Sequence, residues 1–281
     1  MKERILTENQ ISAFALHLKQ EERSKNTVEK YIRDVNAFVA YAGNNAVTKE
    51  MVIAYKNKLL SDNYATRSIN SMLASVNKLF LFLGWDELKA KYIKLQRQIY
   101  CPEEKELSKA EYMRLLNAAK RKGNERLNLL IQTICGTGIR VGELQFITVE
   151  SARCGEAVVY LKGKTRVVLI VRELQKKLLR YATEQKIASG SIFITRSGKP
   201  MSRTNIWREM KNLCTQAGVK TQKVFPHNLR HLFARVFYSI EKDIVRLADI
   251  LGHSSINTTR IYVISTGYEH RRRLETLQLI I

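Results

Sequence analysis

The chain has 281 residues, which is long enough for two domains of ordinary size, and its 45% hydrophobic content is sufficient to build a core in each. Its formal net charge of +22 exceeds what solubility requires and points to a polyanionic partner, for which nucleic acid is the first candidate. Acidic membrane surfaces are the alternative. However, no apolar run of about 18 residues predicts a membrane span, and the first residues show no secretory signal.

The four cysteines do not indicate a metal site or a disulfide framework. They lie far apart in the sequence, without a C-x-x-C pair. Cysteines spaced in this way are what we expect of a protein in a reducing cytoplasm. The cysteines are Cys101, Cys135, Cys154 and Cys214.

The first hundred residues predict helices throughout. In residues 24–43, SKNTVEKYIRDVNAFVAYAG, apolar residues recur at helical spacing between a capping segment and Gly43. Residues 64–85, YATRSINSMLASVNKLFLFLGW, repeat this pattern. The polar faces of the two helices are basic, which indicates either contact with DNA or an ordinary solvated surface. The candidates for DNA contact are Lys25, Lys30, Arg67 and Lys78.

A linker is predicted over residues 99–106, where the apolar periodicity lapses around Pro102. It separates a helical, DNA-binding domain over residues 1–98 from a second domain over residues 107–281. A new helix begins beyond the linker, where Ser108 and Glu111 have the spacing of a capping box.

The second domain is expected to be mainly α-helical with one small β-hairpin. Its segment LNLLIQTICGTGIRVGEL predicts an apolar helix interrupted by Gly136 and Gly138. In EAVVYLKGKTRVVLIV, residues 158–161 and 167–170 predict strands, and KGKTR predicts a basic turn. The turn region adds Lys164 and Arg166 to the candidate DNA contacts.

The stretch FPHNLRHLF, residues 225–233, places His227 and His231 four residues apart, the spacing with which helical metalloproteases hold zinc. That motif needs a glutamate directly after the first histidine, and here the position is Asn228. Arg230 lies on the same predicted face as His227. A histidine beside an arginine suits an anion better than a cation, so we predict no metal site.

Two further cations lie where they can reach a cleft. Arg140 follows a glycine pair in GTGIRVGEL, and Glu143 is expected to hold its guanidinium. Lys162 lies at the hairpin turn, where a mobile lysine can deliver a proton. Taken singly, each also fits an ordinary solvated surface residue.

The segment ILGHSSINTTRIYV carries the last two candidates. Gly252 is expected to end one helix and Ser254 or Ser255 to cap the next, so His253 lies near a helix N-terminus that favours negative charge. Tyr262 follows His253 by nine residues. On its own, Tyr262 fits a packing residue as well.

These residues form an ordered set with complementary chemistry. Two arginines can neutralise a phosphodiester, and two histidines can hydrogen-bond to it or move protons. A lysine can protonate the departing oxygen, and a tyrosine can attack phosphorus. The predicted catalytic set is Arg140, Lys162, His227, Arg230, His253 and Tyr262.

The motifs GTGIRVGEL, YLKGKTRVV, HNLRHLFA and LGHSSINTTRIYV resemble those of the tyrosine recombinases, the phage integrase and Xer family. The helical segments of the first hundred residues are similar to the core-binding domain of that family, so the resemblance covers almost the whole chain. It implies a two-domain clamp around DNA, in a bacterial or phage-encoded cytoplasmic protein. Tyr262 would form a 3′-phosphotyrosyl bond and release a 5′-hydroxyl, without a metal, ATP or another cofactor.

The resemblance also implies partners. Four protomers would act on two double-stranded DNA sites of specific sequence through a Holliday junction, for integration, excision, inversion or dimer resolution. Without DNA the protein would be a monomer or associate weakly, and it would have no membrane partner. The tail, residues 270–281, is expected to be a helix that docks on a neighbouring protomer or packs in its own domain.

Some residues depart from the family pattern. The hairpin reads LKGK where a glycine usually precedes the lysine, so Lys164 is a second candidate for the general acid. Leu232 stands where threonine is commoner, which affects packing. His231 is frequent in the family, and we do not count it as catalytic.

Two other functions fit part of the pattern. A type IB topoisomerase resembles the site but relaxes DNA without pairing two sites. A DNA-binding regulator on the same scaffold would carry out no chemistry. Complete retention of the six residues argues against the regulator.

Overall fold

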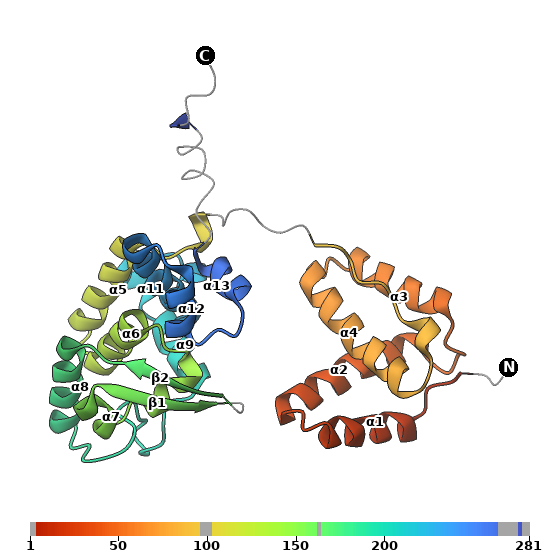
Figure 1. The fold of residues 1–281 in the computed structure, drawn as a ribbon, viewed down its shortest axis with the longest axis horizontal. Helices are drawn as coiled ribbons and strands as arrows, with labels where there is room; N and C mark the ends of the chain where they lie inside the picture. The colour runs from red at the N-terminus through yellow and green to blue at the C-terminus, as the bar shows by residue number, and fades with distance from the viewer. Residues whose placement is uncertain (1–3, 96–102, 162–163, 264–274, 277–281) are drawn as a thin grey trace. The chain divides into compact units, whose positions relative to one another are not determined.

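The computed structural model describes residues 4–95, 103–161, 164–263 and 275–276 (Figure 1). The chain divides into two compact units, residues 1–97 and 98–281. Each unit has its own hydrophobic core. The two units are therefore described one at a time.

The first unit is a small helical bundle. Its elements are α1 (Glu8–Gln20), α2 (Lys25–Ala42), α3 (Lys49–Ser61), α4 (Thr66–Phe82) and the 3-10 turn η1 (Asp86–Leu88). Helices α2 and α4 confirm the two helices predicted from apolar spacing, and α2 ends at Gly43 with φ of 59°. Their apolar faces meet in the core, where Phe38 packs edge-on against Phe80 at 5.7 Å between ring centres.

The second unit is mostly helical with one hairpin. Its first elements are η2 (Glu103–Lys105), α5 (Lys109–Arg121), α6 (Glu125–Thr137), η3 (Val141–Phe146), α7 (Val149–Cys154), β1 (Glu156–Leu161) and β2 (Lys164–Leu169). The later elements are α8 (Arg172–Glu184), α9 (Arg203–Lys211), α10 (Cys214–Ala217), η4 (Thr221–Lys223), α11 (Pro226–Glu241), α12 (Ile244–Leu251) and α13 (Ile256–Val263).

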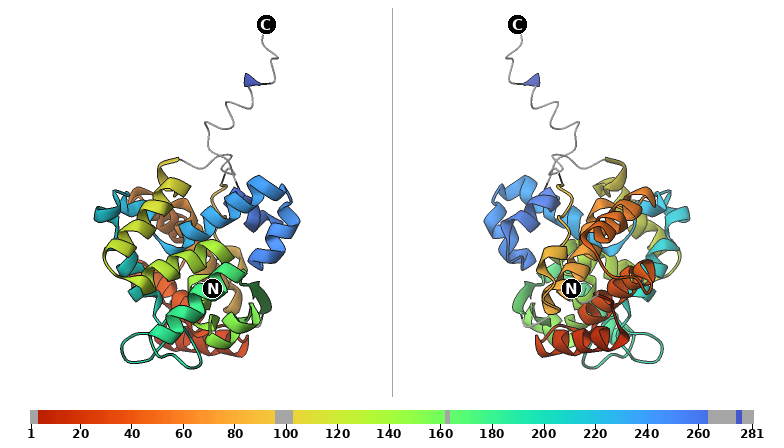
Figure 2. Two further views of the ribbon diagram at one scale, coloured as in Figure 1. Left: turned by 90° about the vertical axis from the view of Figure 1, so that its left-hand side faces the viewer. Right: turned by 90° about the vertical axis from the view of Figure 1, so that its right-hand side faces the viewer.

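Helices α11, α12 and α13 pack against one another, and α11 also packs along α6. A small cluster of apolar residues joins the last three helices, apart from the main core of the unit. Figure 2 shows α12 and α13, in blue, together at one edge of the second unit. Segments far apart in sequence therefore meet where α6, α11, α12 and α13 come together.

The capping box predicted at the start of α5 is confirmed. The N–H of Glu111 donates to Ser108 Oγ at 3.1 Å, and the N–H of Ser108 donates to Glu111 Oε2 at 2.8 Å. The predicted interruption at Gly136 is wrong, because this residue lies inside α6 and the helix ends only at Gly138. A Cβ at position 136 would meet nothing within 4 Å, so the glycine does not mark a close contact.

The hairpin is longer than the sequence predicts. Strands β1 and β2 pair antiparallel, with Val158 opposite Val167 and Leu161 opposite Lys164. The expected basic turn is therefore too long, since Lys164 to Arg166 already belong to β2. Side chains alternate between the two faces of β2, as in any strand: Arg166 points inward, whereas Thr165 and Val167 are exposed.

Within the described residues, no helix combines the length and apolar character needed to cross a membrane. This finding concerns only the helices given above.

Gly138 ends α6 with φ of 63°, and a Cβ there would lie 2.6 Å from the ring of Phe233. Gly190 has φ of 76° but nothing within 4 Å of its Cβ position. Both alanine substitutions carry backbone strain of about 1 kcal/mol. We expect Gly138→Ala to lower the free energy of unfolding by about 1–3 kcal/mol more than Gly190→Ala, because only the former overpacks the core.

This difference is measurable by urea denaturation in a Trp85→Phe background, in which Trp207 is the only remaining tryptophan and reports on the second unit. Equal losses in the two alanine variants would show that Phe233 accommodates the methyl group freely.

Candidate active site

The loop between α6 and η3 positions Arg140. The left-handed conformation of Gly138 ends α6, so Arg140 becomes the residue that precedes η3. Its Nη1 donates to Glu143 Oε1 at 2.9 Å, and its backbone N–H donates to Oε2 of the same carboxylate at 3.0 Å. The predicted contact with Glu143 is confirmed. The Arg140 side chain remains 38% exposed, so it can still meet a ligand.

Glu143 is buried between two guanidinium groups. Besides Arg140, Arg166 donates from Nη2 to Glu143 Oε2 at 2.6 Å, and the carboxylate is only 2% exposed. Burial raises the pKa of Glu143, but the hydrogen bonds from Arg166 and Arg140 outweigh burial and hold this pKa below its usual value. Glu143 is therefore ionised at neutral pH.

Arg166 is less exposed than we expect of a DNA contact. We expect it from the sequence to contact DNA, but its side chain is 12% exposed and both terminal nitrogens are engaged within the protein, by Glu143 and by the carbonyl of Ile250. Its stem also fills the space that a Cβ at Gly252 would need, at 2.3 Å. Arg166 connects the hairpin to the end of α12, which favours a positioning role.

Three arginines meet at the C-terminal end of α12. The last carbonyls of a helix lack partners within the helix and carry the negative end of its dipole. Each of three successive carbonyls here accepts a hydrogen bond from a different guanidinium. The pairs are Arg166 with Ile250 at 2.7 Å, Arg230 with Leu251 at 2.7 Å and Arg140 with Gly252 at 3.0 Å.

Arg230 is a buried cation that donates its hydrogen bonds to backbone carbonyls. The side chain, on α11, is 1% exposed and donates to the carbonyl of Gly138 as well as to Leu251. Among the described residues no carboxylate pairs with it. Burial, and then the charge of Arg140, lower its pKa to about 10, so it stays charged at neutral pH. An uncompensated buried charge is costly, and an anion bound beside it would remove that cost.

His253 joins this network through both ring nitrogens. Its Nε2 lies 2.9 Å from Arg230 Nη2, and its Nδ1 lies 2.9 Å from Thr259 Oγ1. Since an arginine can only donate, Nε2 accepts and the ring proton lies on Nδ1, facing Thr259. Burial, followed by the charges of Arg230 and Arg140, lowers the pKa of His253 to about 4, so the ring is neutral at neutral pH.

The ring of Tyr262, on α13, is enclosed by three histidines. It stacks on His231 with 4.1 Å between ring centres and lies 5.1 Å from His227 and 5.0 Å from His253. The guanidinium of Arg230 lies 5.8 Å from the ring centre. Tyr262 is only 7% exposed. Residues from separate parts of the sequence thus meet around one tyrosine, which lies beside a buried cation.

His227 lies in the first turn of α11, where free backbone N–H groups and the helix dipole favour an anion. His227 is an exposed residue. Partial desolvation, then the charges of Arg230 and Arg140, lower the pKa of His227. His231 is deeper, and burial followed by the nearby His227 and Arg235 lowers its pKa to about 3. Both rings are therefore neutral at neutral pH.

Asn228, which occupies the position of the metalloprotease glutamate, anchors the start of α11. Its amide donates to the carbonyls of Lys105 and Lys223 at 2.7 and 2.8 Å. No cluster of three or more metal-ligating side chains occurs in the described ranges.

The structure brings five of the six predicted catalytic residues together, and the sixth, Lys162, lies outside the described residues. Lys164 is described only by its backbone, as the first residue of β2. The tail helix predicted over residues 270–281 also falls outside the described part, apart from residues 275 and 276.

The candidate DNA contacts of the first unit differ in their surroundings. Lys30 binds the buried Asp34 at 2.7 Å, and Lys78 binds Glu21 at 2.5 Å, so each has an acidic partner within the bundle. Arg67 is exposed and lines an open pocket between α2 and α4 together with Lys30 and Arg33. Lys25 is 89% exposed on the first turn of α2 and lies 3.9 Å from Glu29. Arg67 and Lys25 are therefore the more exposed of the four candidates.

Sequence reasoning missed the roles of two residues in the site. Thr259 Oγ1 lies 2.9 Å from Nδ1 of His253, and Arg166 shares the Glu143 carboxylate with Arg140. A signal existed for Thr259, because it lies one helical turn before Tyr262 in NTTRIY and therefore on the same face of a helix. For Arg166 no such signal exists in the sequence, because residues 162–166 are expected from the sequence to form the hairpin turn.

Known protein families match both units. The model of the phage integrase family matches residues 105–267, which is more than half of the chain, and the N-terminal SAM-like domain of phage integrases matches residues 11–87. The chain belongs to the phage integrase family. The family match spans every described residue of the candidate site.

Two curated members of this family are similar over most or all of the chain. Tyrosine recombinase XerA of Pyrococcus furiosus is 27% identical over 287 residues, covering 100% of this chain and 98% of that protein. Tyrosine recombinase XerD of Vibrio cholerae is 26% identical and covers 85% of each chain.

Solved structures share the fold. A lambda integrase fragment, crystallised as a dimer bound to a COC′ core site, has a TM-score of 0.75 with 15% identity, covering 93% of this chain and 96% of that chain. The XerH site-specific recombinase bound to difH substrate has a TM-score of 0.67 with 18% identity, covering 98% and 90%. At these identities the likeness concerns the fold alone.

Glu143→Gln keeps the shape of the side chain but removes the charge between two guanidiniums. We expect the free energy of unfolding to fall by about 3 kcal/mol at pH 7. Because the pKa of Glu143 is lowered in the folded state, its contribution is present above the unfolded value of 4.5 and is lost as pH falls through the folded value. The difference between wild type and variant should therefore shrink below pH 4.5.

Urea denaturation at a series of pH values measures this difference. The control is Glu173→Gln, which removes a carboxylate that is 73% exposed and should change stability little at any pH. If Glu143→Gln and Glu173→Gln gave equal losses, the buried carboxylate would not hold the two arginines in place.

Proposed function

We propose that the chain is a site-specific DNA recombinase that cuts and rejoins strands through a 3′-phosphotyrosyl intermediate. One observation carries the proposal most directly: the buried, uncompensated charge of Arg230 lies within 6 Å of the Tyr262 ring, beside the half-exposed Arg140. A phosphodiester placed there supplies the missing negative charge. Membership of the phage integrase family supports the same reaction.

In the proposed reaction, Arg140 and Arg230 bind the two non-bridging oxygens of the scissile phosphate. The hydroxyl oxygen of Tyr262 attacks phosphorus, and the bond from phosphorus to the 5′ oxygen breaks. His227 accepts the proton of Tyr262, because its lowered pKa keeps the ring neutral. A hairpin lysine gives a proton to the leaving 5′ oxygen.

Rejoining reverses these steps, with the 5′-hydroxyl of another strand as the nucleophile. The phosphotyrosyl bond keeps the energy of the broken phosphodiester, so neither ATP nor a metal enters the scheme. His253 holds Arg230 through Nε2 and belongs to the same phosphate site.

The substrate we propose is double-stranded DNA with a specific recombination site. The first unit acts as the core-binding domain over residues 1–98, and the catalytic domain begins at 107, beyond the linker of residues 99–106. The excess of positive charge supports DNA binding by both. We expect this reaction to take place in the cytoplasm of a bacterium, on chromosomal or phage DNA.

The assembly we propose is a tetramer on two DNA sites that passes through a Holliday junction. Support comes from a relative in fold, a lambda integrase tetramer bound to a Holliday junction, with a TM-score of 0.73 and 15% identity. Without DNA the chain would associate weakly. Docking of residues 270–281 on a neighbouring protomer would link assembly to the nearby nucleophile.

Replacement of Tyr262 by Phe removes only the attacking hydroxyl. We expect the covalent protein–DNA complex on a nicked suicide substrate to disappear, while binding measured by gel shift changes less than about threefold, since the net contribution of one neutral hydrogen bond is about 0.5 kcal/mol. Tyr181→Phe, which removes a hydroxyl from the main core of the same unit, is the control and should cleave normally. Cleavage by Tyr262→Phe would show that another tyrosine is the nucleophile, and Tyr268 would be the next residue to test.

A change of the leaving group in the DNA substrate separates the role of the hairpin lysine from the role of the arginines. A 5′-bridging phosphorothiolate leaves as a thiolate and needs little protonation, so it should rescue a variant that lacks the general acid. We expect rescue of Lys162→Ala and none of Arg140→Ala or Arg230→Ala, measured as the rate of covalent complex formation. Rescue of Lys164→Ala instead would assign the acid to the first residue of β2.

A further inference from the structure

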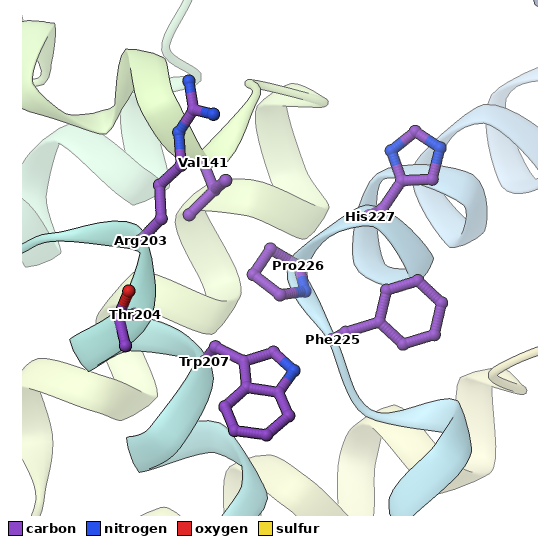
Figure 3. A pocket seen from close by; sticks show the side chains of 7 residues that line it. All are labelled: Val141, Arg203, Thr204, Trp207, Phe225, Pro226 and His227. Atoms are coloured by element: carbon purple, nitrogen blue, oxygen red, sulfur yellow. The ribbon is translucent and has the colours of Figure 1, made fainter. Parts of the chain in front are cut away.

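The two ring nitrogens of His253 have different surroundings. Nε2 lies 2.9 Å from Arg230 Nη2 and so faces the candidate phosphate site, whereas Nδ1 lies 2.9 Å from the hydroxyl oxygen of Thr259. Solvent reaches the phosphate site at His227, an exposed residue that also lines an open pocket (Figure 3). Thr259 is fully buried. Any effect of Thr259 on a bound phosphate therefore acts through His253.

The hydroxyl of Thr259 keeps a proton that it does not use elsewhere. A threonine inside a helix can give its hydroxyl proton to the carbonyl four residues earlier. Thr133 and Thr137 of α6 do so, at 2.8 and 2.7 Å. Thr259 does not, and within the described ranges His253 is the one hydrogen-bond partner of its hydroxyl. A hydroxyl can accept or donate, so this proton remains available to the ring.

A phosphate in the site would change what is needed from His253. Phosphate oxygens accept hydrogen bonds and donate none, so a bare Nε2 would present its lone pair to another lone pair. Burial, and then the charge of Arg230, lower the pKa of His253 to about 4, which makes a second ring proton costly at neutral pH. A neutral ring can donate from Nε2 only when its proton lies there, and Nδ1 then needs a donor.

We infer that Thr259 is a positioning residue whose hydroxyl inverts its hydrogen bond with His253 when a phosphate binds, and this inference rests on the proposed function. In the empty site, Thr259 accepts from Nδ1–H while Nε2 accepts from Arg230. In the occupied site, the ring proton lies on Nε2 and is donated to a phosphate oxygen, and Thr259 donates to Nδ1. The ring loses one proton to water and takes one back, so its charge does not change. Arg230 Nη2 is released to the phosphate.

Nitrogen-15 NMR of the histidine rings tests the inversion directly, because protonated and bare ring nitrogens differ in chemical shift. The full chain, labelled with nitrogen-15 histidine, is titrated with inorganic phosphate, and His253 is assigned from the signals that disappear in His253→Asn. We expect the Nδ1–H tautomer without phosphate and the Nε2–H tautomer at saturation. A ring that keeps its tautomer, or that gains a second proton, would overturn the inference.

Two variants of the threonine then separate the hydroxyl from the shape of the side chain. Thr259→Val removes the hydroxyl, and we expect it to slow covalent complex formation on a nicked suicide substrate about tenfold, which corresponds to one hydrogen bond. Its ring should no longer change tautomer with phosphate. Thr259→Ser keeps the hydroxyl and should retain both the cleavage rate and the tautomer change. The matched control is Thr258→Val, the same substitution at the exposed neighbouring position of α13, which should behave as the unmodified chain.

The proposed function and this inference fail in different ways. Cleavage by Thr259→Val at the unmodified rate would overturn the inference and leave the proposed function intact. The absence of a covalent complex in the unmodified chain would contradict the proposed function, whereas the tautomer of His253 is read with inorganic phosphate and without cleavage. If Thr259→Val and Thr259→Ser both cleave slowly while the ring of each still changes tautomer, Thr259 serves packing alone and the inference is wrong.

Discussion

The free carbonyls at the end of α12 are the constraint on which the rest of the site depends. A helix that ends inside a protein must satisfy its last carbonyls, and here three arginines do so, from three different elements. Glu143 then fixes two of these arginines relative to each other. The hairpin, the loop after α6 and helix α11 are thereby held at one point, next to the tyrosine that follows on α13.

The choice of acceptors determines the charge of the site. A carbonyl satisfies a guanidinium without neutralising it, whereas a carboxylate cancels one unit of charge. Among the described residues, Glu143 is the carboxylate that pairs with these arginines, and it contacts Arg140 and Arg166 but not Arg230. The remaining positive charge is centred on Arg230, which is buried and held in place before any ligand arrives. Such a pre-organised cation binds a phosphate without reorganisation at the moment of reaction.

Much of this arrangement can be predicted from the sequence, and the reasons for the failures are physical. Helical spacing and caps are local, so α2, α4 and the capping box of α5 follow from the sequence. The interruption expected at Gly136 does not occur because an exposed glycine costs a helix only about 1 kcal/mol, which packing of α6 overrides. Arg166 escapes prediction because its partners, Glu143 and the Ile250 carbonyl, are set by tertiary contacts distant in sequence.

The same charges explain why the histidines around Tyr262 are neutral. Burial and the nearby arginines both disfavour a second positive charge, so the pKa of His227 lies below its usual value and that of His253 falls to about 4. A neutral imidazole can accept a proton, whereas an imidazolium cannot. When a phosphate binds, its negative charge offsets part of the field of the arginines and makes a protonated histidine less costly. In the proposed reaction the site would therefore become a better base when the phosphate is bound, which would couple proton transfer from the tyrosine to occupation of the phosphate site.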